Sequence, residues 1–590
     1  MLLQRLVEYS ARLDLPPALY SETPVRYVIE LGADGRLLSP EPVDTADPAS
    51  PRTKRGFRRP MPQVQRSSGI KPLLLANNAE YTLGLARDPS KAKRVAACHR
   101  AYLELLERCT ANTDEPAVQA VLTFLSGDPL SHLRLPEGFD RNATITFRVD
   151  GVFPVDLPGV QSFWAAANDP DADSTRPAAI MQCLVCGRKR PVLERLQGKI
   201  KGVPGGKPSG TSIISANAKA FESYGLAASL IAPTCQECGE RFTKAANALL
   251  ADRSSRIDLG GTAFIFWTRK KVDFSFWELL VEPKTEQVHW LLGSAYSGNG
   301  LPELDATAFY ATALSGSGGR AVVRDWIDTT IGEVRRHLAA WFQRQAIVGT
   351  HGEDSQPMGL YPLALSLVRD SRDLVPPAPR ALLRTAVTGA PIPMDLLFQA
   401  VRRNRAEQGI TRPRAALIKL VLLSQHPTDK EDTMVQLEPN NQTPAYLCGR
   451  LLAVLEEVQR LAVPGAKTTI VDRFFGTASS APSSVFGRLL RGAQPHLAKL
   501  ERDRPGAWRA LQGRLEEIQS SLSGFPRILT LEEQGLFALG YYHQRAWDRK
   551  AAREAAQRRK AGQTIDGDTA DLVLEAANHV GSKENGEEEN

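Results

Sequence analysis

The sequence predicts an α+β protein, in which a mixed α/β N-terminal region is followed by an all-α C-terminal helical bundle. Three observations predict this fold class. Short runs of alternating apolar and polar residues, such as 25–31 and 145–149, indicate strands in the first two-thirds of the chain. Two close pairs of cysteines mark an insertion in that region, at about 180–245. After a proline-rich segment at 370–380, apolar residues recur at helical spacing.

The predicted N-terminal region covers residues 1–369 and begins with an amphipathic helix. The strand at 25–31 meets Gly32-Ala-Asp-Gly35 and a second short apolar run, a pattern that predicts a β-hairpin. The segment 39–68 is rich in Pro, Ser and Arg and has no periodicity, so we expect a long exposed loop there.

The C-terminal helical bundle is predicted over residues 381–557, with the segment 370–380 as the linker before it. Amphipathic helices must bury their apolar stripes against one another, and this favours a bundle. Thr530 and Glu533 match a capping box, in which each side chain bonds the other residue's backbone N–H at a helix start. The charged residues 558–590 are expected to form a frayed tail.

Composition places the chain among globular proteins of two to four domains, because its 590 residues are 42% hydrophobic and 24% charged. The longest apolar runs, such as 417–423, contain a charge and are too short to cross a bilayer. The first residues carry Glu8 and Asp14 and lack the continuous apolar core of a signal peptide. We therefore expect a cytoplasmic protein without a membrane partner.

The most specific motif is a pair of Cys-x-x-Cys sequences, formed by Cys183 with Cys186 and by Cys235 with Cys238. A glycine follows each pair and suits a tight turn in which backbone amides approach sulfur. Four thiolates match the tetrahedral coordination that Zn²⁺ prefers, and they leave no open position for substrate. The sequence predicts a structural zinc-knuckle insertion. The alternatives are two unrelated thiol pairs or a redox pair.

A second motif gathers cations around one aromatic residue within the segment 51–60. Its five cations are Arg52, Lys54, Arg55, Arg58 and Arg59, beside Phe57. Guanidinium groups bind phosphates in bidentate fashion and also read guanine in the major groove. The chain as a whole is mildly basic, with a formal charge of +7. This pattern favours a nucleic-acid contact, and a solvated charged loop is the alternative.

Catalytic motifs are weak in this sequence. The segment 202–208 is one residue short of a phosphate-binding loop and has proline where Ser or Thr should bind Mg²⁺. The nine histidines show no HxH or HxxxH pairing, and His543, beside two tyrosines, is expected to be a packed residue. We expect a protein that is not an enzyme. The rival hypotheses are a zinc-containing nuclease and a stand-alone zinc-ribbon DNA-binding protein.

Several segments occur in an order and spacing that resemble one known family. They are SGIKP with NNAEYTLG (68–84), FESYG (221–225), LS with RAVVRDW (314–326), AYLCGRL (445–451), and EEQGLF with GYYHQR (532–545). Together they resemble the large (signature) subunit of the type I-C (Dvulg subtype) CRISPR Cascade effector complex. The resemblance spans nearly the whole chain, from Leu2 to Arg545.

The resemblance implies a non-catalytic subunit that recognises the protospacer-adjacent motif in double-stranded target DNA, helps to open the duplex and stabilises the R-loop for antiviral defence. The implied partners are the 5′ handle of the guide RNA (crRNA), the Cascade backbone, handle-binding and small subunits, and a recruited helicase–nuclease. In this family the C-terminal helical part is also made separately by internal translation, and Met434 is one candidate start.

For the motif-reading site we predict Lys71, Asn77 and Asn78, because Lys and Asn side chains pair with base edges. On the flanking phosphates we predict four of the cations of the segment 51–60, namely Lys54, Arg55, Arg58 and Arg59. For Lys71 the structural alternative is a turn that enters a helix, and for the two asparagines it is a helix N-cap.

Overall fold

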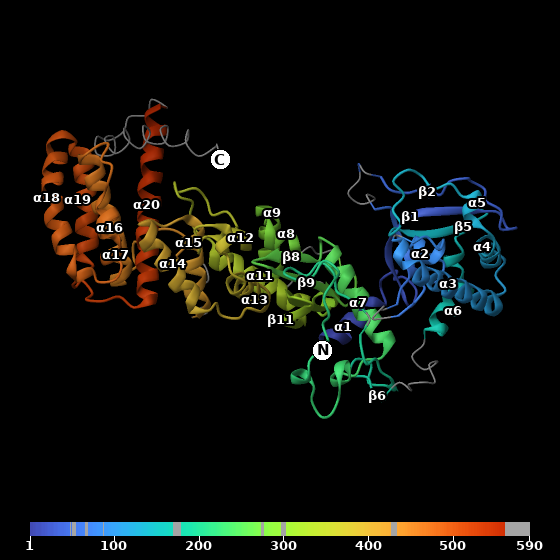
Figure 1. The fold of residues 1–590 in the computed structure, drawn as a ribbon. Coiled ribbons are helices and arrows are strands. Elements are labelled where there is room, and N and C mark those ends of the chain that lie inside the picture. The colour runs from blue at the N-terminus through green and yellow to red at the C-terminus, as the bar shows by residue number, and fades with distance from the viewer. Residues whose placement is uncertain are drawn as a thin grey trace. The chain divides into compact units, whose positions relative to one another are not determined.

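A computed structural model describes residues 1–560 except 48, 50–54, 65–68, 87, 169–178, 197, 273–275, 297–301 and 426–433 (Figure 1). The chain divides into two compact units. The first contains Met1–Ala251 and Gly316–Val322, and the second contains Asp252–Ser315 and Val323–Asn590. Strands and helices occur in both units and the C-terminal part is helical, which confirms the predicted α+β class.

The first unit is built on a five-stranded sheet of order β2-β1-β5-β4, with β3 also paired to β1. Its strands are β1 (Tyr20–Leu31), β2 (Val43–Asp44), β3 (Phe57–Pro62), β4 (Ala76–Asn77) and β5 (Thr144–Val149). The first half of β1 pairs with β3 in antiparallel fashion, and most of its length pairs with β5 in parallel fashion. The long strand β1 therefore organises this sheet.

Helices pack on this sheet and fill the core of the first unit. They are α2 (Ala79–Thr82), α3 (Ala92–Thr113), α4 (Pro116–Ser126), α5 (Pro129–His132) and α6 (Pro158–Ala167). Tyr102 of α3, Val121 of α4 and Trp164 of α6 are buried in one cluster with Ile29 and Phe147 of the central strands. This core supports the segments that carry the predicted DNA-binding residues.

The prediction of a long loop over 39–68 was wrong where the structure describes this segment. β2 and β3 both lie inside it, and β3 pairs with Tyr20–Val25 despite Pro60 and Pro62. Proline is tolerated in an edge strand, because its missing N–H can face away from the partner strand. The backbone hydrogen bonds to β1 therefore form a strand in a segment whose Pro-, Ser- and Arg-rich composition had suggested a loop.

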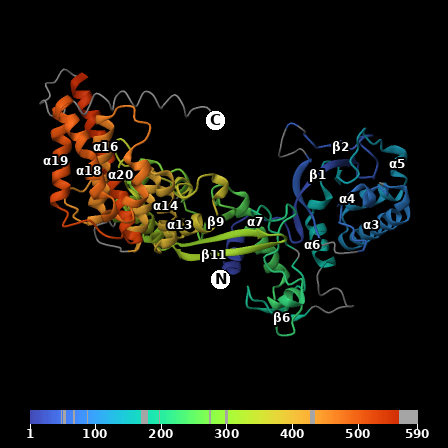
Figure 2. The same cartoon turned by 60° about the vertical axis from the view of Figure 1, so that its left-hand side comes forward.

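Most of a four-stranded sheet of order β11-β10-β9-β8 belongs to the second unit, where helices follow it, while residues 316–322 at the end of β10 and the start of β11 are counted with the first unit (Figure 2). The strands are β8 (Arg256–Leu259), β9 (Thr262–Thr268), β10 (Ala308–Ser317) and β11 (Arg320–Thr330). The helices up to residue 425 are α8 (Phe276–Val281), α9 (Thr285–Tyr296), α10 (Pro302–Asp305), α11 (Ile331–Gln345), α12 (Leu360–Leu365), α13 (Pro377–Thr388), α14 (Met394–Glu407) and α15 (Arg412–Gln425).

The predicted linker at 370–380 lies inside the second unit. Ser371–Asp373 forms a single 3₁₀ turn, and α13 begins at Pro377, where proline is favoured because the first helical N–H has no partner. Leu363 before this segment and Leu382 after it belong to one buried cluster. A functional boundary between 1–369 and 381–557 stays a prediction.

The chain ends in a bundle of α16 (Pro444–Ala462), α17 (Ile470–Ala478), α18 (Phe486–Asp503), α19 (Pro505–Ser520) and α20 (Leu531–Lys560) (Figure 1). The capping box is confirmed: the backbone N–H of Thr530 donates to Glu533 over 2.7 Å, and that of Glu533 donates to the Thr530 hydroxyl over 3.2 Å. Residues 561–590, most of the predicted tail, lie outside the described residues.

Within the described ranges, none of the helices is both long enough and apolar enough to span a membrane.

Candidate functional site

The four cysteines of the two Cys-x-x-Cys pairs come together in the first unit, where their sulfur atoms all lie within 4.8 Å of one another. Cys183 and Cys186 lie in the turn between β6 (Ile180–Gln182) and β7 (Lys189–Pro191). Cys235 precedes α7 (Gln236–Ala251), and Cys238 lies in its first turn. Zn–S bonds of about 2.3 Å place the sulfurs of a tetrahedral site roughly 3.8 Å apart. The observed spacing fits a bound Zn²⁺.

The two glycines that follow the cysteine pairs have different roles. Gly187 has a φ of +72° and donates its N–H to the carbonyl of Cys183 over 2.9 Å, as expected for a tight turn. Gly239 lies inside α7, where a β-carbon would lie 2.8 Å from Cδ2 of Leu196. The expectation of a turn at Gly239 was wrong, because this glycine permits close packing of a helix instead.

The electrostatics of the cluster suit a cation. Burial opposes ionisation of Cys183, but hydrogen bonds from the backbones of Cys186, Cys235 and Val185 lower its pKa to about 7. Burial raises the pKa of Cys238, and the neighbouring sulfur of Cys235 raises it further. Cys183, Cys235 and Cys238 are buried and Cys186 is exposed, and four thiolates this close together would repel one another unless a divalent cation neutralised them. Because protein sulfurs would fill all four positions, the site suits structural zinc.

The cysteine module also holds the start of the chain. Leu3 and Val7 of α1 (Leu2–Ser10) pack against the buried cysteines. The guanidinium of Arg241 on α7 donates to the Ser10 hydroxyl over 2.9 Å. The carboxylate of Glu240 accepts the backbone N–H of Leu19 over 3.0 Å, one residue before β1. No local sequence pattern indicated these contacts, which join segments more than 200 residues apart.

The predicted phosphate-contacting cations lie in different surroundings. Arg55 and Arg58 are exposed, Arg58 on β3 and Arg55 just before it, whereas Lys54 lies outside the described residues. Arg59 instead forms an ion pair with Asp156 and stacks 3.6 Å from the ring centre of Phe153. Since neighbouring strand residues point to opposite faces, the side chains of Arg58 and Arg59 lie on opposite faces of β3, and their contact with phosphates stays a prediction.

The three predicted motif-reading residues also differ in exposure. Lys71 is exposed in the extended segment before β4. Asn77, on β4, is only 4% exposed, and its side-chain oxygen accepts the N–H of Asn78 over 3.1 Å. Asn78 is half-buried at the N-cap position of α2, without a side-chain capping bond. The structure therefore leaves Lys71 available to a ligand and holds Asn77 in the sheet.

Two of the segments that suggested the family form a helix contact in the second unit. The Tyr446 hydroxyl and Nδ1 of His543 share a hydrogen bond of 3.0 Å, and Arg450 donates to Gln544 over 3.0 Å. His543 is fully buried, so its interpretation as a packed, hydrogen-bonded residue is confirmed. These residues stabilise the α16–α20 pair.

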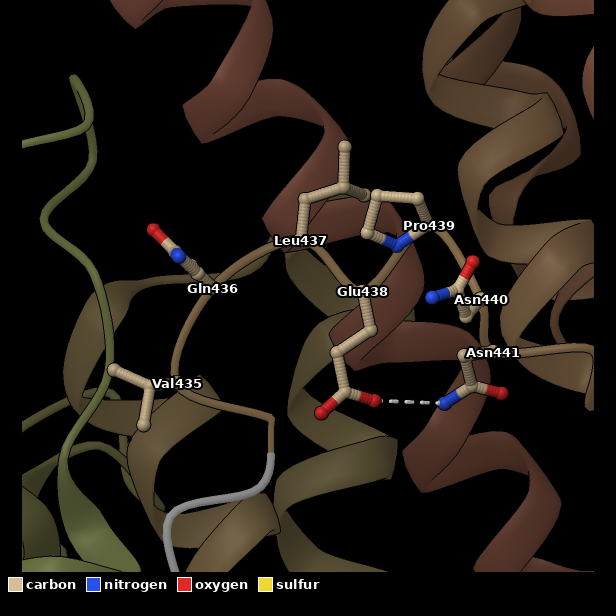
Figure 3. Close-up of a pocket in the computed structure, with 7 residues that line it drawn as sticks. All are labelled: Val435, Gln436, Leu437, Glu438, Pro439, Asn440 and Asn441. Carbon is tan, nitrogen blue, oxygen red and sulfur yellow. Dashed lines mark hydrogen bonds between the residues drawn. The ribbon is translucent and has the colours of Figure 1, made fainter.

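A cleft of about 550 Å³ lies in the loop before α16, lined by residues 435–441 (Figure 3). Figure 3 shows the Glu438 carboxylate directed at Asn441, whose amide donates to it over 3.1 Å. Glu438 also accepts the backbone N–H of Met434 over 2.5 Å. Because these polar groups satisfy one another, the cleft is a weak candidate for ligand binding.

Among the side chains that the structure describes, the four cysteines are the one cluster with metal-ligand spacing. No curated protein matches the chain. A family model, Cas_Csd1, described as a CRISPR-associated protein, matches residues 4–548. This match covers most of the sequence and confirms the family resemblance. The chain belongs to the Cas_Csd1 family of CRISPR-associated proteins.

Proposed function

We propose that this chain is the large subunit of a type I-C CRISPR surveillance complex, and that it recognises the protospacer-adjacent motif in double-stranded DNA. The observation that carries the proposal is the family match over residues 4–548. In this role the chain helps to open the duplex and stabilises the R-loop, while base pairing with the guide RNA reads most of the target sequence.

Exposed cations of the first unit supply the proposed contact with DNA. Arg55 and Arg58, together with Lys54, bind backbone phosphates, and Lys71 approaches a base edge. Asn77 and Asn78 complete the proposed site only if the segment around β4 rearranges when DNA binds, since Asn77 is buried. Arg59 contributes through the position of β3, because Asp156 already compensates its charge.

Zinc bound by the four cysteines stabilises the fold in this proposal and performs no chemistry. A metal that catalyses hydrolysis needs a coordination position open to water or substrate, and four thiolates leave none. We therefore assign DNA cleavage to the recruited helicase–nuclease. The other proposed partners are the crRNA 5′ handle and the backbone, handle-binding and small subunits, all in the cytoplasm.

Reconstitution of the complex with and without this chain tests the proposal. Binding of a duplex that carries the motif should be lost when the chain is omitted. Lys71→Ala should reduce discrimination between a target motif and a scrambled one, whereas Lys93→Ala, which removes an exposed lysine of α3, should leave it unchanged. Equal binding of target duplexes by complexes that lack the chain would refute the proposal.

A further inference from the structure

An exposed aromatic residue stands at the tip of a strained turn in the first unit. Tyr224 and Gly225 have φ values of +56° and +70°, and the N–H of Leu226 donates to the carbonyl of Ser223 over 2.9 Å. Two successive positive φ angles define a type I′ turn, whose first central position favours Asn, Asp or Gly. Tyr224 occupies that position with its side chain 100% exposed.

The backbone conformation of Tyr224 costs free energy, and its exposed ring contributes no burial that would offset this cost. A bulky residue with positive φ is a steric outlier, and a fully exposed ring gains nothing from burial. Backbone strain of this kind persists where the surrounding structure enforces it, and it concentrates at ligand-binding sites. The turn therefore presents the ring of Tyr224 to solvent, where a ligand can contact it.

Backbone hydrogen bonds connect the chain that follows the turn to the cysteine module. The N–H of Ser229 donates to the carbonyl of Glu194 over 2.9 Å, and that of Leu193 donates to the carbonyl of Thr234 over 3.0 Å. The second contact lies directly beside Cys235 of the cysteine cluster. The chain that leaves the turn is thus hydrogen-bonded to the module that the four cysteines close.

A second aromatic ring, Phe221, precedes Tyr224 by three residues in the chain and carries a cation on its face. The guanidinium of Arg320 stacks 4.2 Å from the ring centre of Phe221 and donates to the side chain of Asn217. The backbone of Arg320 pairs with Ser212, whose hydroxyl accepts from the Lys199 ammonium over 2.6 Å. Phe221 itself is 45% exposed.

Partly exposed rings beside cations are typical of surfaces that bind single-stranded nucleic acid, where bases stack on rings and cations offset phosphates. Protein interfaces are also enriched in Tyr and Arg, but there the aromatic anchors are packed in well-filled pockets. Tyr224 stands between Ser223 and Gly225, so a nucleobase fits this turn better than a protein partner.

We propose that Tyr224 stacks on an unpaired base of the opened target DNA, beside the Arg320 cation. This inference rests on the proposed function and deepens it, because it assigns a contact that forms after the duplex has separated. Tyr224 then favours the open state, and the exposed cations around β3 favour the initial duplex contact.

The test uses the complete complex and a target duplex with 2-aminopurine at single positions beside the motif. The fluorescence of this base reports its stacking environment. Tyr224→Ala should slow duplex opening about 5- to 150-fold, the range expected for loss of one aromatic–base stack. Tyr224→Phe keeps the ring and should stay within about twofold of the wild type, since the stacking surface is retained. Tyr361→Ala, which removes a 45% exposed aromatic of the second unit, is the matched control and should have no effect.

Tyr224→Gly separates function from folding. Glycine adopts positive φ without steric cost, so the thermal midpoint should stay equal or rise while duplex opening slows as in Tyr224→Ala. Opening at the wild-type rate by both variants would overturn the inference, as would loss of subunits from the Tyr224→Ala complex, which would make the turn a protein contact. If the proposed function itself fails, omission of the whole chain leaves duplex binding intact. If only this inference fails, omission abolishes binding and the Tyr224 variants behave normally.

Discussion

Gly540 of α20 lies directly against the carbonyl oxygen of Tyr446 on α16, so closely that a β-carbon at Gly540 would overlap this oxygen. Gly449 has the reciprocal relationship with the carbonyl of Phe537. The two helices therefore cross backbone to backbone at a pair of glycines. This close approach allows the buried hydrogen bonds between Tyr446 and His543 and between Arg450 and Gln544.

The first prediction concerns this crossing. Gly540→Ala should destabilise the second unit by about 1–3 kcal/mol, because the added methyl group forces the helices apart. Gly492→Ala is the control: this glycine lies within α18 with no atom near its β-position, so alanine should be neutral or stabilising there. Urea denaturation followed by far-UV circular dichroism measures both. Equal midpoints for the two variants would contradict the close crossing.

The second prediction concerns metal content. The purified chain should contain about one zinc ion, bound by four thiolates. Cys186→Ala should remove it, since this exposed cysteine is a proposed ligand and its loss disturbs packing least. Cys109→Ala, which changes a buried cysteine of α3 outside the cluster, should retain the metal. Elemental analysis by mass spectrometry measures the metal content directly.

Removal of the metal should also loosen the N-terminal helix, because α1 packs on the cysteine module. Hydrogen exchange in Leu2–Ser10 should therefore accelerate when a chelator is added. Zinc-free protein with unchanged exchange in this helix would show that the metal does not stabilise the module.

The third prediction separates two neighbouring arginines. Arg58→Ala should lower the salt dependence of duplex binding by about one unit of slope, as expected for the loss of one phosphate contact. Arg59→Ala should instead destabilise the first unit, because it leaves Asp156 without its ion-pair partner and removes the stacking on Phe153. Binding isotherms at several salt concentrations, together with thermal denaturation, distinguish the two effects. Arg94→Ala, at an exposed arginine of α3, serves as a control for a general change of charge.

The fourth prediction concerns pH. Burial, and secondarily the charge of Lys419, lower the pKa of His543 to about 3, against about 6.5 in an unfolded chain. The folded state binds fewer protons than the unfolded state between these values, so stability is fully present above about pH 6.5 and is lost as the pH falls. The loss approaches about 1.4 kcal/mol per pH unit.

His543→Gln should flatten this dependence, whereas His289→Gln, at an exposed histidine of α9, should preserve it. Urea midpoints of the second unit at pH 7.5, 6.5 and 5.5 provide the measurement. These three pH values cover the upper end of the range, below about pH 6.5, in which stability is expected to fall. Identical slopes for the wild type and His543→Gln would exclude His543 as the source of the pH dependence.

Local patterns predicted several parts of this fold. The capping box at Thr530 and Glu533 formed as expected, because both partners lie within one helical turn. The cysteine cluster formed from two pairs whose spacing places each pair on one turn of chain. The helical periodicity after residue 444 became a bundle, since amphipathic stripes have few other ways to leave water.

Other features depended on contacts between distant segments. Composition indicated a loop at 39–68, yet Phe57–Pro62 became a strand because β1 offered it a hydrogen-bonding edge. A run of cations suggested one phosphate-binding cluster, but Asp156, 97 residues further along the chain, pairs with Arg59. Asn77 appeared in a polar segment, yet the strand that carries it is buried against β5.

The sequence by itself indicated the cluster of two cysteine pairs, the helical C-terminal part and the family, because these depend on residue types at short spacings and on the order of motifs along the chain. Only the tertiary structure decided which cations remain exposed, where Tyr224 is held, and how closely Gly540 approaches Tyr446. The physical reason is that exposure, ion pairing and helix crossing are set by groups brought together from distant parts of the chain, and a local pattern does not specify those partners.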